Sequence, residues 1–323
     1  MIDRRFDLVI IGHLTIDLMK YGVEERKQIG GPPAYAMLGP KLGLKNVGIV
    51  SRIGKDFPQE YYNELIDSGL NLDGVIRNEE TTQFINVYDQ DGNRTQSVGA
   101  VANSLSCFDV PKSYWNTKWM HISPVLGETD LSLIKEAKAH DVKVSVDAQG
   151  FVRKRSAIDH TITGCDWTNF PNVASEIDVL KADIDEVTRI ARTSTYQEAA
   201  KTILTMGCPL ILITQGQKGS FLYQESYSAV IPAISPNRVV DHTGSGDVFA
   251  ISFLAEYQRT HRPLWSAFFA SSSASFNVET PGPTNFPSYQ KVVSRLRNYL
   301  SHTKNRHYIK LLLNESGPTD CPL

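Results

Sequence analysis

Short apolar segments alternate with longer segments of helical periodicity along most of this 323-residue chain. The short segments are typical of buried strands, and they occupy residues 8–11, 47–53, 119–122, 142–146, 179–181 and 210–214. The helical segments occupy residues 34–44, 57–68, 130–140, 196–206, 249–260, 264–277 and 289–302. Strands that alternate with helices predict an α/β fold, in which helices cover both faces of a mostly parallel sheet.

Other segments depart from this alternation. Residues 17–29 are mixed and polar, which is typical of an exposed strand, and residues 81–98 predict a β-hairpin with a Gly-containing turn. Because both arms of this hairpin carry polar side chains, we expect it to cover another part of the molecule. A second hairpin is expected over residues 219–231. Residues 303–323 show no clear pattern and are expected to form a C-terminal tail, either docked or loose.

Composition excludes several classes of protein. The formal net charge is −2, with 33 basic and 35 acidic residues, so no nucleic-acid partner is expected. The four cysteines lie far apart, which argues against a zinc site and a disulfide framework and suits a reducing compartment. No stretch has a signal-peptide pattern or membrane-spanning length. We therefore expect a cytoplasmic protein without a membrane partner.

Residues 239–249 carry the pattern of a site. A β-branched run ends at Asp241; two glycines follow, and Asp247 then stands where an apolar helical segment begins. The N–H groups at such a helix start have no partner within the helix and favour an anion. A carboxylate beside a bound anion suits the removal of a proton from a hydroxyl that attacks phosphorus. The alternative is that Asp247 only complements the helix dipole.

Three motifs resemble the ribokinase/PfkB family of sugar kinases. Gly30-Gly31, followed by a small-residue helix and by Ser51-Arg52-Ile53-Gly54-Lys55-Asp56, is similar to the family's N-terminal signature. Thr214-Gln215-Gly216-Gln217-Lys218-Gly219 is similar to its T-x-G-x-x-G motif. Asp241 to Asp247 is close to its D-x-T-G-A-G-D motif, with Ser245 in place of alanine. The motifs are in register over nearly the whole chain, which makes the resemblance specific.

The resemblance implies a ribokinase-like three-layer α/β/α fold with a mostly parallel central sheet and a small β-sheet lid. The kinase domain would span residues 1–302 and contain the lid segments, at about residues 15–30 and 76–101. Residues 303–323 would be the C-terminal tail. An exposed lid strand favours pairing between subunits, so we expect a homodimer formed through the lid.

The resemblance also implies roles in phosphoryl transfer from ATP. Asp247 would be the general base, and the N–H groups of Gly244, Ser245 and Gly246 would hold the charge on the transferred group. The residues expected to bind the nucleotide are Thr214, Gly216, Gly219, Thr243, Asn277 and Gly282, the last two near the adenine. Glycines at strand ends and hairpin entries also have a plain turn explanation.

Metal ions are expected as further cofactors. Residues 181–186 (Lys-Ala-Asp-Ile-Asp-Glu) resemble the family's N-x-x-E motif, with Asp183 where asparagine is usual. Glu186 would orient Mg²⁺ and its waters, with Asp183 beside it. The alternative is an acidic helix start after a strand. Asp241, Thr243 and the Pro281-Gly282 loop resemble the family's monovalent-cation site, so K⁺ is also expected.

Four residues are expected to bind the acceptor. Asp17 follows the first strand, where the family clamps two hydroxyls with one carboxylate, and Gly31 would let the acceptor lie against bare backbone. Gln149 and Arg153 follow another strand, on the side where ligands bind in open α/β sheets. For Arg153, pairing with a surface acid is an equally good interpretation.

Departures from ribokinase disfavour ribose as the acceptor. Residues 32–35 (Pro-Pro-Ala-Tyr) stand where the ribose enzyme has lysine, glycine, alanine and asparagine, and Thr15 replaces another asparagine. Residues 12–17 and 146–153 look most like archaeal members of the family, including myo-inositol kinases. We therefore expect ATP-dependent phosphorylation of a sugar or cyclic polyol, with a myo-inositol-like acceptor favoured.

Two alternatives stay open. A nucleoside kinase of the same family would need an apolar slot for the base, which Tyr35, Phe84 and Phe151 could line. A non-catalytic sugar- or nucleotide-binding regulator could use the same scaffold, although the intact Asp247 and glycine turn argue against it.

Overall fold

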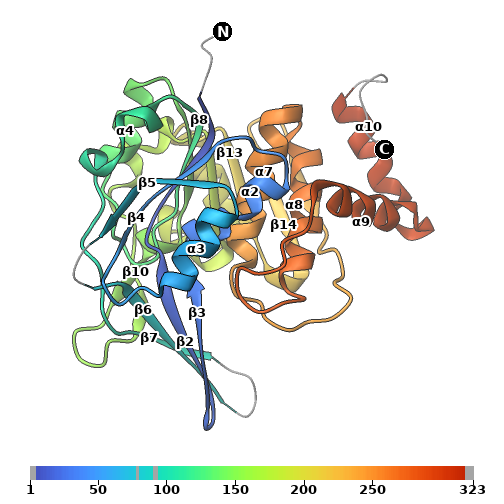
Figure 1. Ribbon diagram of the computed structural model, residues 1–323. Helices are drawn as coiled ribbons and strands as arrows, with labels where there is room; N and C mark the ends of the chain where they lie inside the picture. Colours follow the sequence, from blue (N-terminus) through green and yellow to red (C-terminus); the bar gives the residue numbers. More distant parts are fainter. Residues whose placement is uncertain (1–4, 78–79, 90–93, 317–323) are drawn as a thin grey trace.

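The computed structural model describes residues 5–77, 80–89 and 94–316 (Figure 1). The strands of its main sheet are β1 (Phe6–Ile11), β4 (Val47–Ile53), β5 (Leu70–Arg77), β8 (Thr117–Ile122), β9 (Lys143–Asp147), β12 (Val179–Asp183), β13 (Leu210–Thr214), β14 (Ser220–Gln224) and β15 (Ser228–Ile231). Their order is β15-β14-β13-β12-β9-β8-β1-β4-β5. Neighbours from β13 to β5 pair in parallel, and β14 and β15 form the expected antiparallel hairpin.

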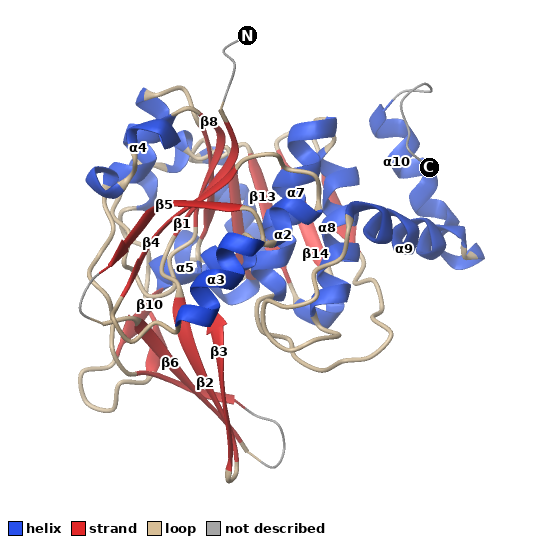
Figure 2. Cartoon of the chain, viewed as in Figure 1, coloured by secondary structure: helices blue, strands red, loops and turns tan. Residues whose placement is uncertain are grey.

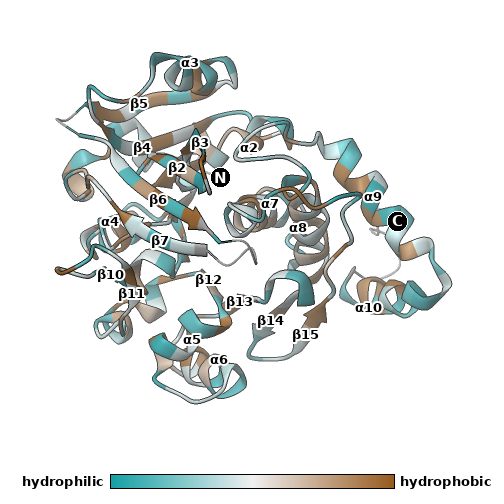
Figure 3. Cartoon of the chain, turned by 90° about the horizontal axis from the view of Figure 1, so that it is seen from below, coloured by the Kyte–Doolittle hydropathy of each residue, from teal (hydrophilic) through white to brown (hydrophobic). Residues whose placement is uncertain are grey.

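Helices cover both faces of this sheet. One face carries α1 (Pro32–Tyr35), α2 (Leu38–Lys41), α3 (Gln59–Asp67), α7 (Ser245–Thr260), α8 (Pro263–Asn277) and α9 (Tyr289–Ser301). The other face carries α4 (Ser132–Ala139), α5 (Ile184–Ala191) and α6 (Tyr196–Thr205). Successive residues of β1 alternate between the two cores: Leu8 and Ile10 join the first, and Val9 and Ile11 join the second. Figure 3 shows α5 and α6 across β12 and β13 from α7 and α8. The predicted three-layer architecture is therefore confirmed.

Some elements differ from the sequence expectation. Residues 34–44 form two short helices, α1 and α2, rather than one. Pro40 explains the break, because it cannot donate the N–H that a continuous helix would need at that position. The strand β5 and the small hairpin of β10 (Arg153–Arg155) and β11 (Ile162–Gly164) were not predicted, and the start of α5 was expected only as the alternative to a metal site at residues 181–186.

The predicted lid is a separate four-stranded sheet. Its strands are β2 (Thr15–Tyr21), β3 (Glu24–Gly30), β6 (Thr82–Tyr88) and β7 (Arg94–Val98), in the order β3-β2-β6-β7. It projects from the body at the lower end of Figure 2. Phe84 and Val98 pack on Val125 of the body, and Val98 N donates to His160 O at 3.0 Å. The tip of the predicted hairpin, residues 90–93, lies outside the described residues, and dimerisation through the lid stays a prediction.

The C-terminal tail contains a helix that the sequence did not reveal. The helix α10 (Arg306–Ser316) lies beyond α9, at the right of Figure 1. Its Leu312 is fully buried, and the Glu315 carboxylate accepts hydrogen bonds from Leu264 N (2.6 Å) and Trp265 N (2.9 Å) in the first turn of α8. The tail therefore docks as far as Ser316, whereas residues 317–323 lie outside the described residues. No described helix combines the length and the apolar character needed to cross a bilayer.

The contact between α10 and α8 predicts a stability effect. Glu315→Ala removes the carboxylate that caps α8, so the free energy of unfolding should fall by about 1–2 kcal/mol. Urea denaturation followed by circular dichroism measures it. Lys310→Ala is the matched control, because Lys310 is an exposed side chain of the same helix. Equal effects of the two substitutions would contradict the capping role.

Candidate active site

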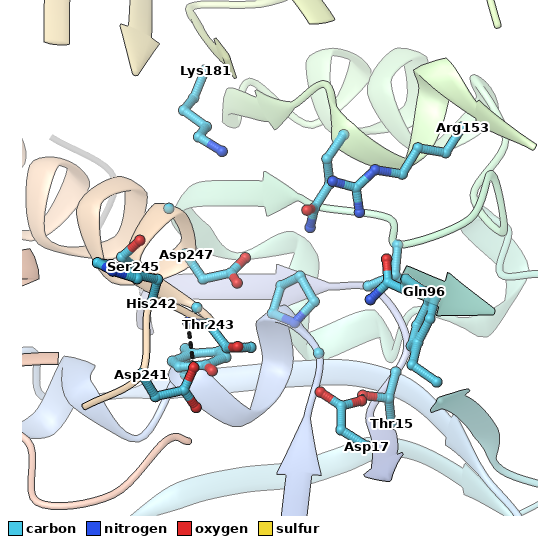
Figure 4. Close-up of a pocket in the computed structure, with 18 of the residues that line it drawn as sticks. Thr15, Asp17, Gln96, Arg153, Lys181, Asp241, His242, Thr243, Ser245 and Asp247 are labelled. Atoms are coloured by element: carbon cyan, nitrogen blue, oxygen red, sulfur yellow. Dashed lines mark hydrogen bonds between the residues drawn. The ribbon is translucent and has the colours of Figure 1, made fainter. Parts of the chain in front are cut away.

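A cavity of about 530 Å³ opens between the lid and the start of α7 (Figure 4). It lies at the carboxyl ends of the parallel strands, where ligands bind in open α/β sheets. It brings together many of the predicted site residues: Asp17, Gly31, Gln149, Arg153, Thr243, Gly244, Ser245, Gly246 and Asp247. We call it the first cavity.

A second cavity, of about 310 Å³, lies on the other side of the α7 start. Thr214, Gly216 and Gly219 line it, as expected for the nucleotide site. Its remaining wall is largely apolar and includes Ala233, Ile234, Pro236, Val239, Phe249, Ala274 and Val278. Both cavities share His242, Ser245 and Gly246. A donor in the second cavity and an acceptor in the first would therefore meet at this turn.

The turn before α7 is held in one conformation by its neighbours. Gly244 is the N-cap of α7 and has a φ of 74°, which favours glycine. A Cβ atom on Gly244 would overlap the ring of Tyr35, which packs directly against the turn. Thr243 N donates to Asp241 Oδ1 at 2.8 Å, and Asn277 Nδ2 donates to Thr243 O at 2.9 Å. The first-turn N–H groups of α7 are thus fixed beside the junction of the two cavities.

Asp247 has the properties of a general base. Its Oδ1 atom is shielded from solvent and has no hydrogen-bond partner within the described part of the chain. Burial raises the pKa of Asp247 to about 7; the carboxylates of Asp147 and Glu186 add to this, and Lys181 and Arg153 oppose it. A carboxylate that titrates near neutral pH can both accept a proton from a hydroxyl and release it afterwards.

The lid supplies a second carboxylate to the first cavity. Asp17 is 6% exposed, and Thr15 donates its hydroxyl hydrogen to Asp17 Oδ1 at 2.7 Å. Tyr35 lies among the acids of the cavity: burial raises the pKa of its phenol, and the charges of Asp247, Asp17 and Asp241 raise it further. The Tyr35 hydroxyl is buried without a partner among the described residues. The Tyr35 hydroxyl could therefore form a hydrogen bond with a hydroxyl of a molecule bound in the cavity.

Lys181 and Asp147 are site residues that the sequence analysis missed. They are register partners on the parallel strands β12 and β9, and Lys181 Nζ lies 2.9 Å from Asp147 Oδ2. Burial alone would lower the pKa of Lys181, but the carboxylates of Asp147, Glu186 and Asp247 raise it above its usual value. Lys181 is thus a charged ammonium in the lining of the first cavity. The available signal was a charged residue at the end of each of two apolar strand patterns.

The predicted metal residues line neither of the two cavities. Asp183 and Glu186 cap α5 reciprocally: Glu186 N donates to Asp183 Oδ1 (2.7 Å), and Asp183 N donates to Glu186 Oε2 (2.8 Å). Burial raises the pKa of Glu186 to about 7, while Lys181 lowers it. In the described residues, no group of three or more His, Cys, Asp or Glu could hold a metal. These two carboxylates fit Mg²⁺ only as a hydrated ion that is bound mainly by donor phosphates.

Arg153 and Phe151 have partners that sequence alone left open. Arg153 lines the first cavity, and its Nη2 lies 3.6 Å from Glu186 Oε1, so its partner is a buried acid and not a surface acid. Phe151 stacks on Trp167, with ring centroids 4.0 Å apart, and does not line the first cavity. Of the aromatic slot proposed for a base, Tyr35 and Phe84 remain, and Tyr21 joins them.

Asn277 and Gly282 do not reach the second cavity, although they were expected near the adenine. Asn277 is buried and supports the turn through Thr243, and Gly282 N donates to Asp241 Oδ2 at 3.4 Å. The structure therefore brings the residues of the expected K⁺ site together. However, both Asp241 oxygens already accept backbone N–H groups, so a K⁺ site stays a prediction.

Two cavities that meet at a glycine turn beside a partly buried carboxylate are the arrangement that a phosphotransferase needs, and the fold is ribokinase-like. Residues 5–290 match the family model described as pfkB family carbohydrate kinase, and the chain belongs to this family of kinases.

Three similar proteins illustrate the range of this family. The chain is 31% identical to the cytidine kinase of Thermococcus kodakarensis, over 80% of this chain and 90% of that protein. The crystal structure of the nucleoside kinase of Methanocaldococcus jannaschii, an archaeal member of the ribokinase family, matches with a TM-score of 0.75 at 24% identity, covering 91% of this chain and 99% of that one. A pyrophosphate-dependent kinase in the ribokinase family, complexed with a pyrophosphate analogue and myo-inositol, matches with a TM-score of 0.72 at 21% identity, covering 88% and 99%.

The raised pKa of Asp247 predicts an acid limb in the pH profile. Below about pH 7 the carboxyl is protonated and cannot accept a proton, so kcat/KM for the acceptor should fall about tenfold for each further pH unit. Glu186 titrates in the same range, and Glu186→Gln separates the two. That variant should be slower but should keep the limb, shifted slightly downward because a negative neighbour is lost. A Glu186→Gln profile without an acid limb would assign it to Glu186.

The contact between Gly244 and Tyr35 predicts a strong effect of a single methyl group. Gly244→Ala adds left-handed strain and an overlap with the Tyr35 ring, so the free energy of unfolding should fall by about 2–5 kcal/mol and turnover should be lost. Gly69→Ala is the control, because Gly69 has a φ of 87° but nothing within 4 Å of the added Cβ. Gly69→Ala should lower the free energy of unfolding by about 1–2 kcal/mol and leave kcat unchanged. Thermal unfolding and steady-state kinetics measure both.

Proposed function

We propose that this kinase transfers a phosphoryl group from ATP to a hydroxyl of a nucleoside, with Asp247 as the general base. The observation that carries the proposal is that the two cavities meet at the turn of residues 244–246, with Asp247 beside it. An acceptor hydroxyl next to Asp247 would face a donor phosphate that is bound at the same backbone N–H groups.

The apolar wall of the second cavity supports ATP as the donor. Ile234, Val239 and Phe249 offer the kind of surface that binds an adenine ring. Pyrophosphate, which the similar myo-inositol enzyme uses, has no ring to place there. When bound, Mg²⁺ would add positive charge to the donor phosphates near Glu186.

The first cavity supports a nucleoside as the acceptor. Asp17, oriented by Thr15, can accept hydrogen bonds from the two neighbouring hydroxyls of a ribose ring. Tyr21 and Phe84 of the lid both line this cavity and offer aromatic surface on which a base can pack. The cytidine kinase of T. kodakarensis, at 31% identity, supports the same class.

A cyclic polyol, the acceptor favoured by sequence, is the second candidate. The polar side chains of Gln96, Gln149 and Arg153 in the first cavity favour it, since they offer donors and acceptors for several hydroxyls. The myo-inositol complex of a similar fold supports it as well.

The reaction would use the residues of this chain in a simple sequence. Asp247 takes the proton of the acceptor hydroxyl as its oxygen attacks phosphorus. The N–H groups at the start of α7 stabilise the negative charge of the group in transfer. The lid over the first cavity excludes water, which limits the loss of the phosphoryl group to hydrolysis.

A screen of acceptors and donors tests the proposal. The purified protein should phosphorylate cytidine or another nucleoside with a kcat/KM at least about tenfold above that for myo-inositol and hexoses, and ATP should exceed pyrophosphate. Coupled assays and mass spectrometry of the product measure both preferences. A higher kcat/KM for myo-inositol would select the second candidate.

The catalytic role of Asp247 needs its own test. Asp247→Asn should lower kcat by about 10²–10⁴-fold and leave acceptor binding by calorimetry largely unchanged. Asp185→Asn is the control, because Asp185 is an acid in the first turn of α5 that lines neither cavity. Binding without turnover in the unmodified protein would instead support a non-catalytic regulator.

A further inference from the structure

We propose that Lys181 is a catalytic residue whose ammonium group contacts the phosphoryl group as it passes from donor to acceptor. The inference rests on phosphoryl transfer at Asp247, as proposed above, but not on the identity of the acceptor. Lys181 opens the segment 181–186 that resembles the N-x-x-E motif, but the resemblance gave this lysine no role.

The position of Lys181 is the first argument. A Cβ atom added to Gly246 would lie 2.9 Å from Lys181 Nζ, so the ammonium lies directly against the turn. Gly246 lines both cavities, which places Nζ at the point where donor and acceptor would meet. Figure 4 shows the ammonium end of Lys181 directed into the first cavity on the side of Asp247.

The charges around the turn are the second argument. The carboxylates of Asp147, Glu186 and Asp247 all act on Lys181, and a phosphoryl group in transfer adds further negative charge at this point. Within the described lining of the first cavity, Arg153 is the other lysine or arginine, and it lies 3.6 Å from Glu186. Lys181 is therefore the cation placed to offset the charge of the group in transfer.

The contact with Asp147 is the third argument. An ammonium has three N–H donors, and the ion pair with Asp147 Oδ2 at 2.9 Å leaves at least two of them for other groups. Lys181 is 6% exposed and Asp147 is fully buried, so the pair holds the long side chain in one conformation. The other N–H groups of the ammonium are then held in place before ATP binds. Stabilisation of a transition state requires groups that are positioned in advance.

A purely structural role makes a different prediction. If Lys181 serves only to neutralise buried Asp147, removing both charges should restore an active protein, because a buried ion pair can often be replaced without loss of stability. If Lys181 contacts the phosphoryl group, the same double variant should fold but remain slow. The double variant Asp147→Asn/Lys181→Met therefore separates the two roles.

The experiment compares kcat and KM, with ATP and the best acceptor of the screen, in four proteins: the unmodified chain, the double variant, Lys181→Arg and Lys143→Met. Lys143 is the control, because it is an exposed lysine at the opposite end of β9 from Asp147. The double variant should unfold near the unmodified temperature and bind both substrates, but its kcat should fall by about 10²–10³-fold. Lys181→Arg, which keeps the charge, should recover part of that loss, and Lys143→Met should lose nothing.

Three results would overturn the proposal. They are a folded double variant with unmodified kcat, a loss confined to KM for the acceptor, and a Lys181→Arg variant no faster than the double variant. If the double variant does not fold, Lys181→Arg against Lys181→Gln provides the same comparison of kcat with and without the charge. Turnover that survives Asp247→Asn would instead refute the proposed function, whatever the lysine variants show.

Discussion

The peptide N–H groups at the start of α7 are the constraint on which the rest of the site depends. They can face a ligand only because Gly244 adopts a left-handed conformation and leaves room for the ring of Tyr35. The remaining parts of the fold converge on this point. The sheet ends there, α8 supports the turn through Asn277, and the lid lies across the first cavity. The turn is thus a product of the whole fold and not of its own sequence alone.

Sequence predicted the parts of this molecule that depend on local pattern. Most strands of the main sheet, most helices and the lid hairpin follow from apolar periodicity and from turn residues. Asp247 and its glycines could be predicted to form a site because a helix start and a glycine turn are contiguous in the chain. Pro40 divides a predicted helix in two, as a proline within a helical pattern indicates. The helix α10 was missed because its stability comes from packing and from Glu315, which caps a helix 50 residues earlier in the chain.

The pairing of Lys181 with Asp147 shows why the rest could not be predicted. These residues are 34 positions apart, and their contact exists only because β9 and β12 are neighbours in a particular register. A shift of one residue would send the lysine to the other face of the sheet. Strand order and register are properties of the assembled sheet, so no motif search can find such a pair. The same holds for the pKa of Asp247, which depends on four charged side chains from other elements.

The origin of Asp17 in the lid has a consequence for selectivity. The Asp17 carboxylate belongs to β2 of the lid, whereas Asp247 belongs to α7 of the body. The distance between the two carboxylates therefore depends on how the lid sheet is placed against the body. In the proposed reaction an acceptor would contact both groups, so the gap between them would limit which acceptors can react. In a molecule too short to bridge the two carboxylates, the reacting oxygen would not be aligned with the donor phosphate, even if every hydroxyl formed a hydrogen bond. In the proposed reaction, discrimination by size would therefore depend on how the lid sits on the body as well as on the walls of the pocket.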